Sequence, residues 1–150
     1  IDLTPLTEQS VNKLSRISLD KDTDELGMRK IKFNWNLTTL DKSSIFKNLK
    51  LFGEEMARLG YGRLKMNKIY SEFIDGWGSN TGGGAHHMCT TKMSDNIKKG
   101  VVDSNCKLFK TSNFFIAGSS VFPSGGSVNP TLSIVALSIR LSKHLKKLLT

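Results

Sequence analysis

The most distinctive stretch of this sequence is Gly82-Gly83-Gly84-Ala85-His86-His87-Met88-Cys89-Thr90-Thr91-Lys92-Met93. Consecutive glycines permit backbone angles and close approaches that a Cβ atom would forbid. Histidine is the side chain best suited to exchange a proton near neutral pH. A tightly turned backbone that leads into two adjacent histidines therefore predicts a site for proton transfer.

A second signal is the segment Asn129-Pro130-Thr131, which is predicted to open the last helix. Asn129 suits the N-cap, and Pro130 suits the first helical position because its missing N–H is not needed there. The free N–H groups of such a helix end stabilise negative charge on a bound ligand. With an imidazole nearby, the arrangement suits removal of a proton and a hydride from an alcohol. The side of this helix expected to face the core consists of Leu132, Val135, Ala136, Ile139, Ser142 and Leu145.

The first part of the chain predicts a pair of antiparallel strands, 15–19 and 30–37, joined by the acidic segment 20–25. Apolar and polar residues alternate along the second strand, which predicts one face on a core and one face in water. The acidic segment does not predict a calcium site, because Glu25 and Ile31 stand where a calcium loop needs glycine and glutamate.

A helix is expected to follow, with Asp41 as its N-cap and Gly60 just past its end. Its apolar side chains recur every three or four residues, as on one face of a helix; they are Ile45, Leu49, Phe52, Met56 and Leu59. Further short strands are expected at 63–70, 101–103, 107–109 and 114–117. The last of these is expected to be buried and to end in the turn Gly118-Ser119-Ser120.

The chain has a formal net charge of +9, from 22 Lys and Arg residues against 13 Asp and Glu residues. These basic residues are scattered, which favours a solvated surface. A non-enzymatic module that binds nucleic acid or another polyanion is the alternative interpretation.

No apolar run reaches the ~18 residues of a membrane span. Cys89 and Cys106 are expected to be buried free thiols, and no metal site is expected, because adjacent histidines are poor ligands for one ion.

Four sequence blocks, taken in order and spacing, resemble the C-terminal part of the glucose–methanol–choline (GMC) oxidoreductases, and within that family they look most like the sugar and polyol dehydrogenases. The blocks are His86-His87-Met88-Cys89-Thr90-Thr91-Lys92-Met93, Gly100-Val101-Val102-Asp103, Asn113-Phe114-Phe115-Ile116-Ala117-Gly118-Ser119-Ser120-Val121-Phe122-Pro123 and Asn129-Pro130-Thr131-Leu132. One departure from the family pattern is Cys89, which replaces the usual glycine.

The resemblance implies roles for individual residues. His86 would be the catalytic base that accepts the hydroxyl proton of the substrate, and Asn129 would hydrogen-bond the substrate oxygen. The hydride would pass to the cofactor, FAD. His87 has no clear role in the motif and is expected to be structural. The positions that would contact FAD are Gly118, Ser119, Asn129, Pro130 and Thr131.

The resemblance also implies a mixed α/β (α+β) fold. Residues 1–80 would form part of a substrate-binding domain with antiparallel strands and one helix. Residues 81–150 would be the catalytic segment that contacts FAD and completes a Rossmann-like domain. No Gly-x-Gly-x-x-Gly fingerprint for a dinucleotide occurs in the chain. The FAD-binding portion is therefore expected to come from a missing N-terminal segment or a partner chain, and the chain alone is expected to bind FAD poorly and to be inactive. The expected partners are an alcohol or sugar substrate and an electron-acceptor subunit, with no nucleic acid and no membrane span.

Overall fold

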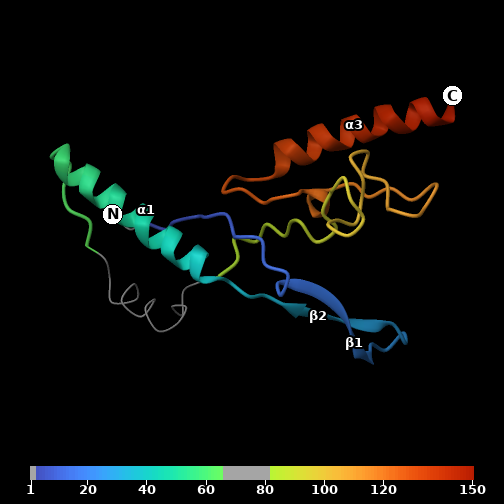
Figure 1. Ribbon diagram of the computed structural model, residues 1–150, viewed down its shortest axis with the longest axis horizontal. Helices are drawn as coiled ribbons and strands as arrows, with labels where there is room; N and C mark the ends of the chain where they lie inside the picture. Colours follow the sequence, from blue (N-terminus) through green and yellow to red (C-terminus); the bar gives the residue numbers. More distant parts are fainter. Residues whose placement is uncertain (1–2, 66–81) are drawn as a thin grey trace. The chain divides into compact units, whose positions relative to one another are not determined.

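The computed structural model describes residues 3–65 and 82–150. Its elements, in chain order, are the strands β1 (Arg16–Thr23) and β2 (Arg29–Asn34), the helix α1 (Thr39–Arg58), the 3-10 helix η1 (Ser119–Val121) and the helix α3 (Thr131–Leu149) (Figure 1). The expected mixed α+β class is confirmed for the described residues. Two compact units divide the chain: one comprises Ile1–Ser15 with Trp35–Gly84, and the other comprises Arg16–Asn34 with Ala85–Thr150.

Strands β1 and β2 form an antiparallel hairpin in which Ile17 pairs with Phe33 and Leu19 pairs with Ile31. The predicted strand pair is thus confirmed, but the first four residues of the acidic segment extend β1 rather than forming a loop. The turn comes later because the Asp24 carboxylate accepts hydrogen bonds from the N–H groups two and four residues further on, at 3.0 and 2.9 Å.

The prediction that the second strand is half-buried is wrong for the described structure. Every residue of β2 is exposed, with 65% of Phe33 and 70% of Ile31 accessible to solvent. The alternation of apolar and polar residues does place the apolar residues of both strands on one side of the hairpin, as the pairs Ile17–Phe33 and Leu19–Ile31 show. Burial additionally requires a second layer on that side, and no described element of the chain supplies one.

Helix α1 begins with a capping box, in which Thr38 is the N-cap and Asp41 is the third helical residue. The assignment of Asp41 as the N-cap is therefore wrong. The side chain of Asp41 instead reaches back to the Thr38 N–H at 2.6 Å. The predicted end is confirmed: Gly60, at φ 75°, donates to Ala57 O at 3.1 Å, and Tyr61 donates to Met56 O at 3.0 Å. These two bonds form a Schellman motif.

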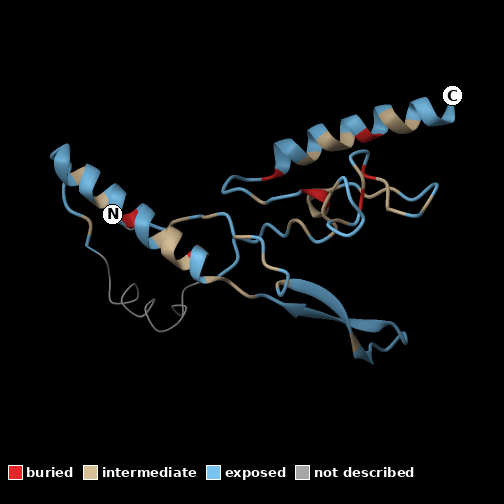
Figure 2. Ribbon diagram, in the orientation of Figure 1, coloured by how far each residue is buried: buried red, intermediate tan, exposed pale blue. Residues whose placement is uncertain are grey.

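The core of the second unit lies between α3 and the loops that precede it (Figure 2). Its buried residues are Val102, Cys106, Val121, Phe122 and Leu141, and the residues of α3 that pack around them are Ile134, Leu137 and Leu145. The prediction of which α3 residues face the core is therefore wrong, except for Leu145. Leu132, Val135 and Ile139 are 83%, 50% and 52% exposed. Helix α3 carries apolar side chains on two sides, and the loops cover only one of them.

Short strands predicted after residue 100 are reduced to single bridges, which pair Met93 with Val102, Val102 with Leu108, and Lys107 with Phe115. The expectation of a buried strand at 114–117 is wrong, because Phe114 is 54% exposed. Positive φ values at Cys106 and Lys110 turn the chain too sharply for a continuous ladder. Residues 63–65 form no strand, and the rest of the strand expected at 63–70 lies outside the described residues.

Candidate functional site

The segment Cys89–Met93 lies against the 3-10 helix η1 and is held there by alternate backbone hydrogen bonds. Cys89, Thr91 and Met93 donate their N–H groups to the carbonyls of residues 119, 120 and 121, at 3.2, 2.9 and 2.8 Å. The hydroxyl groups of Thr91 and Ser120 add a bond of 2.8 Å. The structure therefore brings the histidine block and the Gly118 block side by side. Sequence reasoning missed the Thr91–Ser120 pair, since hydroxyl residues in loops carry no distinctive signal.

His86 and His87 lie just before this segment, and both are exposed. The backbone of His87 is fixed by the Ser119 hydroxyl, which donates to the His87 carbonyl at 2.8 Å. Ala85, the preceding residue, adopts φ 59°, so the chain turns sharply as it reaches the histidines. The His87 imidazole thus reaches the surface from a backbone that Ser119 holds in place.

Gly118 occupies a backbone conformation that is open essentially to glycine alone, with φ 112° and ψ −176°. A Cβ atom at this position would meet nothing within 4 Å. The requirement for glycine is therefore conformational rather than steric. This turn starts η1 and places Ser119 where its hydroxyl reaches the histidine segment.

The predicted cofactor-contacting segment, 129–131, forms the start of α3. Pro130 is buried and serves as the N-cap, with φ −81° and ψ −9°, and no side chain caps the helix. The assignment of Asn129 as a capping residue is therefore wrong. Pro130 already has nearly helical angles, and its carbonyl accepts the Ile134 N–H at 2.9 Å. The N–H groups of the first turn have no acceptor within the helix, as at any helix N-terminus.

Cys89 adopts φ 65°, in the left-handed region that glycine enters without cost. This conformation gives a physical reason for the family's glycine at the same position. The Cys89 side chain is half-buried rather than buried as predicted, and it packs against the core. Cys106 is buried, as predicted.

The loop before α3 approaches the histidine segment at Met88. A Cβ atom built on Gly125 would lie 3.4 Å from Met88 Cε. The loop that leads to Asn129 therefore passes close to the side chain of the residue that follows His87. No hydrogen bond joins His86 to Asn129 in the part of the chain that the structure describes, and both residues are exposed. Their catalytic roles remain predictions.

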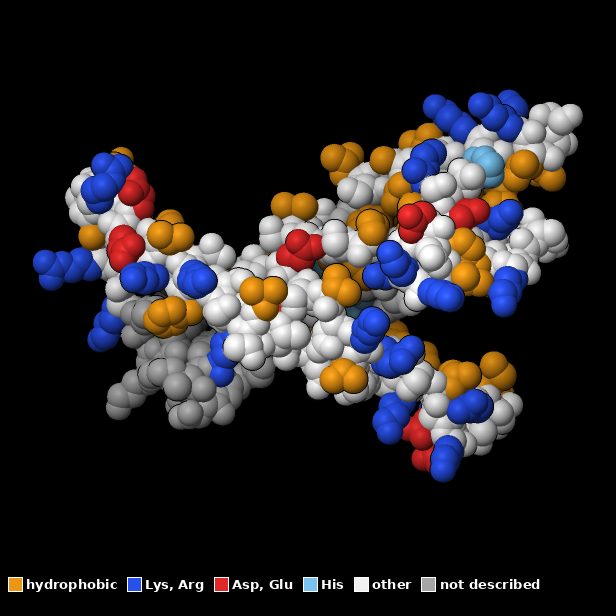
Figure 3. Space-filling model, in the orientation of Figure 1, with side chains coloured by type: hydrophobic (Ala, Val, Ile, Leu, Met, Phe, Trp, Pro, Cys, Tyr) orange, Lys and Arg blue, Asp and Glu red, His pale blue; other side chains and the backbone are white. Residues whose placement is uncertain are grey.

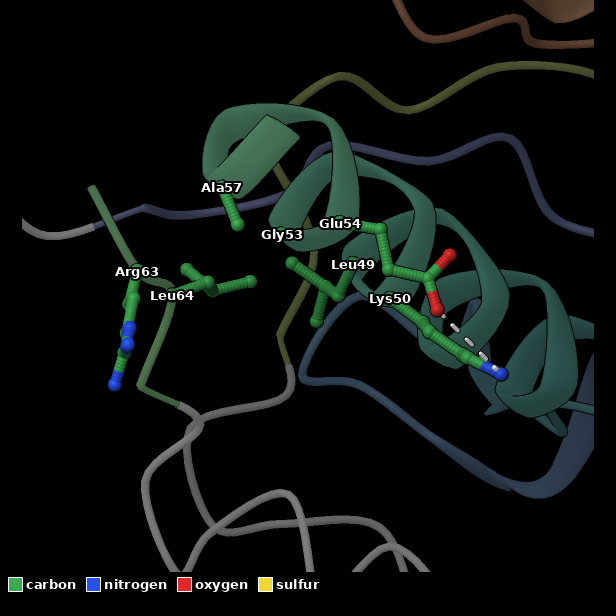
Figure 4. Close-up of a pocket in the computed structure, with 7 residues that line it drawn as sticks. All are labelled: Leu49, Lys50, Gly53, Glu54, Ala57, Arg63 and Leu64. Carbon is green, nitrogen blue, oxygen red and sulfur yellow. Dashed lines mark ion pairs between the residues drawn. The ribbon is translucent and has the colours of Figure 1, made fainter. Parts of the chain in front are cut away.

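A surface hollow occurs in the other unit, where the chain after α1 folds back on that helix (Figure 4). Leu64 lies against Gly53, whose hypothetical Cβ atom would be 3.0 Å from Leu64 Cβ. An exposed ion pair between Lys50 and Glu54, at 3.7 Å, borders the hollow. None of the predicted site residues lines it, and we assign it no function.

Within 3–65 and 82–150, no three His, Cys, Asp or Glu side chains gather as a metal cluster would require. Neither of the long helices in these ranges has the length and hydropathy needed to span a membrane.

The mixed α+β elements of the described residues are consistent with the C-terminal domain of the GMC oxidoreductases. The GMC oxidoreductase family, through the model of its C-terminal domain, matches residues 11–138. A long-chain-alcohol oxidase of Arabidopsis thaliana is 27% identical over 66 residues, which are 44% of this chain and 9% of that protein. Because the family match covers more than half of the chain, the chain belongs to the GMC oxidoreductase family.

Members of this family bind FAD. Two features of the described residues suit such a group. The first N–H groups of α3, at Thr131, Leu132 and Ser133, are left uncapped by any side chain. Such groups suit a carbonyl or anionic acceptor. The Gly118 turn adds a position without a side chain in open space.

Proposed function

We propose that this chain is the C-terminal portion of an FAD-dependent oxidoreductase that oxidises the CH–OH group of an alcohol. The family match over residues 11–138 carries the proposal. The backbone bonds between the histidine segment and η1, together with the uncapped start of α3, support it. Residues 1–80 would contribute to the substrate-binding domain and 81–150 to the catalytic segment. The FAD-binding portion would belong to the same chain or to a partner chain.

The residues of this chain would divide the chemistry among them. His86 accepts the hydroxyl proton of the substrate, since an imidazole is an effective general base near neutral pH. Asn129 donates a hydrogen bond to the substrate oxygen and orients the C–H bond. The chemistry that FAD would supply when bound is acceptance of the hydride from the carbinol carbon. The N–H groups that begin at Thr131 would hold the flavin, and Gly118 and Ser119 would contact the rest of the cofactor.

The substrate we propose is a sugar or polyol, because the four sequence blocks look most like the dehydrogenases of such compounds. A long-chain alcohol is the second candidate, since the Arabidopsis relative carries that activity in its name. The two classes differ in polarity, so one panel separates them. Turnover of hexoses and hexitols without turnover of 1-dodecanol would support the first candidate, and the reverse pattern would support the second.

The decisive experiment compares His86→Ala with His87→Ala in the flavin-loaded native protein. Anaerobic stopped-flow absorbance would follow flavin bleaching after mixing with the alcohol. Loss of the general base should slow this step by ~100-fold or more. His87→Ala is the matched control and should slow it far less, because we assign that imidazole no proton. Equal effects would overturn the choice of His86.

A native protein without flavin would overturn the proposed function as a whole. Duplex binding that falls steeply with salt in such a protein would then favour the polyanion-binding alternative, for which the net charge of +9 is the present support.

A further inference from the structure

Met88 is the first residue after the glycine run whose side chain packs against the core. Residues 82–87 are all exposed, whereas Met88 is half-buried and lies against the buried residues of the second unit. His86 is two residues earlier in the chain. The proposed base is therefore attached to the core through Met88.

The loop that carries Asn129 meets the same side chain. Phe122 and Pro130 are buried, and of the seven residues between them only Gly125 is half-buried, while the others are exposed. Among the described residues, chain neighbours aside, Met88 Cε is the one atom within 4 Å of a Cβ atom built on Gly125, at 3.4 Å. Gly125 itself has no side chain with which to anchor the loop. The Met88 methyl group thus joins the chain after the histidines to the loop before α3.

Ser119 fixes the backbone on both sides of Met88. Its hydroxyl donates to the His87 carbonyl at 2.8 Å, and its carbonyl accepts the Cys89 N–H at 3.2 Å. Both peptide groups of Met88 are therefore held by one residue of η1, which sets the direction of the Met88 side chain. Methionine is unbranched and adaptable, so it can fill the space from this fixed backbone to the loop.

The segments that carry His86 and Asn129 contain no Asp, Glu, Lys or Arg: none occurs in 82–91 or in 111–139. Figure 3 shows the same at the start of α3, where hydrophobic side chains lie along the first part of the helix and Lys and Arg side chains gather over its C-terminal end. No ion pair of these side chains can join the two segments. Their relative position therefore depends on packing, such as that of Met88, and on hydrogen bonds between neutral groups.

We propose that Met88 is a positioning residue that sets the separation of His86 and Asn129. The inference rests on the proposed function, in which His86 accepts the hydroxyl proton and Asn129 hydrogen-bonds the oxygen of the same hydroxyl group. Both side chains must reach one group of atoms at once, which requires their placement to within about 0.5 Å. Met88 supplies this constraint, because its backbone is fixed on the histidine side and its methyl group reaches the loop of Asn129.

The experiment measures the limiting rate of flavin reduction in the flavin-loaded native protein, by anaerobic stopped-flow absorbance at saturating alcohol. D-Sorbitol and 1-dodecanol are the probe alcohols, one from each candidate class. Met88→Leu conserves volume but ends one atom short of the methyl group that reaches Gly125. Met93→Leu is the matched control, because Met93 also packs against the core but donates its N–H group to Val121 O, at the other end of the segment.

Met88→Leu should slow the limiting rate by ~10-fold or more, since misplacement of a reacting group by about 1 Å can cost about 100-fold. Met93→Leu should slow it far less, and the two variants should unfold at similar urea concentrations because both conserve volume. Adding Gly125→Ala to Met88→Leu should restore much of the rate, because the new methyl carbon fills the space that the shorter side chain leaves. The φ of Gly125 is not positive, so alanine suits the backbone there. Loss of stability alone would produce no such rescue.

Equal rates for Met88→Leu and Met93→Leu would overturn the proposal, as would failure of Gly125→Ala to raise the rate of Met88→Leu. A double-mutant cycle adds a second test. Met88→Leu should cause no further slowing in His86→Ala, because the group it positions is absent, and additive slowing would show that Met88 acts on something else.

Failure of the positioning role is distinguishable from failure of the proposed function. If His86→Ala slows flavin reduction and Met88→Leu does not, only the role of Met88 is refuted. A native protein without flavin, or one in which His86→Ala leaves flavin reduction unchanged, refutes the proposed function itself.

Discussion

Replacing Gly100 with alanine should destabilise the second unit strongly, because a Cβ atom at this position has no room. It would lie 2.5 Å from Ser94 Cβ, 2.7 Å from Lys92 O and 3.0 Å from Ser94 N. All three atoms belong to the backbone or are attached directly to it, so no side-chain rotation can relieve the clash. The two segments that meet here would have to separate.

Separation would strain or break the hydrogen bonds that join these segments. Val101 donates to Lys92 O at 2.8 Å, and Ser94 donates to Val102 O at 2.9 Å. Each such bond contributes about 1 kcal/mol net, and overpacking alone costs about 1–3 kcal/mol. The change from glycine to alanine offsets about 0.4–1 kcal/mol of this loss, because it lowers the conformational entropy of the unfolded chain. The net loss should be about 2–4 kcal/mol, or a fall in Tm of roughly 5–15 °C.

Urea unfolding followed by circular dichroism would measure the loss. The matched control is Gly83→Ala, because a Cβ atom there meets nothing within 4 Å. It should change the free energy of unfolding by no more than about 0.5 kcal/mol. If Gly100→Ala were as stable as Gly83→Ala, the close approach of residues 92–94 and 100–102 would be incorrect.

Two further predictions concern stability. Leu141→Ala should lower the free energy of unfolding by about 2–5 kcal/mol, because Leu141 is buried. The control Leu132→Ala lies on the same helix but is 83% exposed, and it should change the free energy of unfolding by no more than about 0.5 kcal/mol in the 150-residue chain. Equal losses in the two variants would contradict the assignment of the two faces of α3. For Asp41, burial raises the pKa of the carboxyl, but hydrogen bonds from Ser10 and Thr38 outweigh it and leave the pKa below its ordinary value. The carboxylate therefore stabilises the fold above its unfolded pKa of about 3.9 and stops doing so as the pH falls through the lower folded value. Asp41→Asn should thus flatten the acid limb of a plot of unfolding free energy against pH, and an unchanged limb would refute the capping-box geometry.

Sequence reasoning succeeded where a signal is local. The strand pair followed from period-two alternation, and the end of α1 followed from Gly60, which adopts φ 75°. Family membership followed from four ordered blocks and is confirmed by the match over residues 11–138. The capping assignments at Asp41 and Asn129 were both wrong: the N-cap of α1 lies three residues earlier, at Thr38, and that of α3 lies one residue later, at Pro130. Cap geometry depends on which side chain reaches a given N–H group, and composition alone does not determine that.

Burial was decided only by tertiary structure. Leu132, Val135 and Ile139 form as good a helical stripe as the buried one, yet the loops before α3 pack on the other side. Phe33 lies on an alternating strand but is 65% exposed, since no described element covers that side of the hairpin. Periodicity fixes which side chains share a face, because it reflects the geometry of one element. Which face is buried depends on a second element, whose position no local pattern encodes.

The stretch 82–93, which contains both adjacent histidines, shows the same difference between what the sequence and the tertiary structure determine. Its sequence identified His86 as the candidate base and placed it after a run of glycines. Only the folded chain shows what holds this segment: the alternate N–H groups of Cys89, Thr91 and Met93, bonded to the carbonyls of η1. Those bonds join residues about thirty positions apart in the chain, and their geometry depends on the turn at Gly118, where φ is 112°. The sequence therefore determines which residues are candidates for the site. Long-range backbone hydrogen bonds determine how the segment next to them is held.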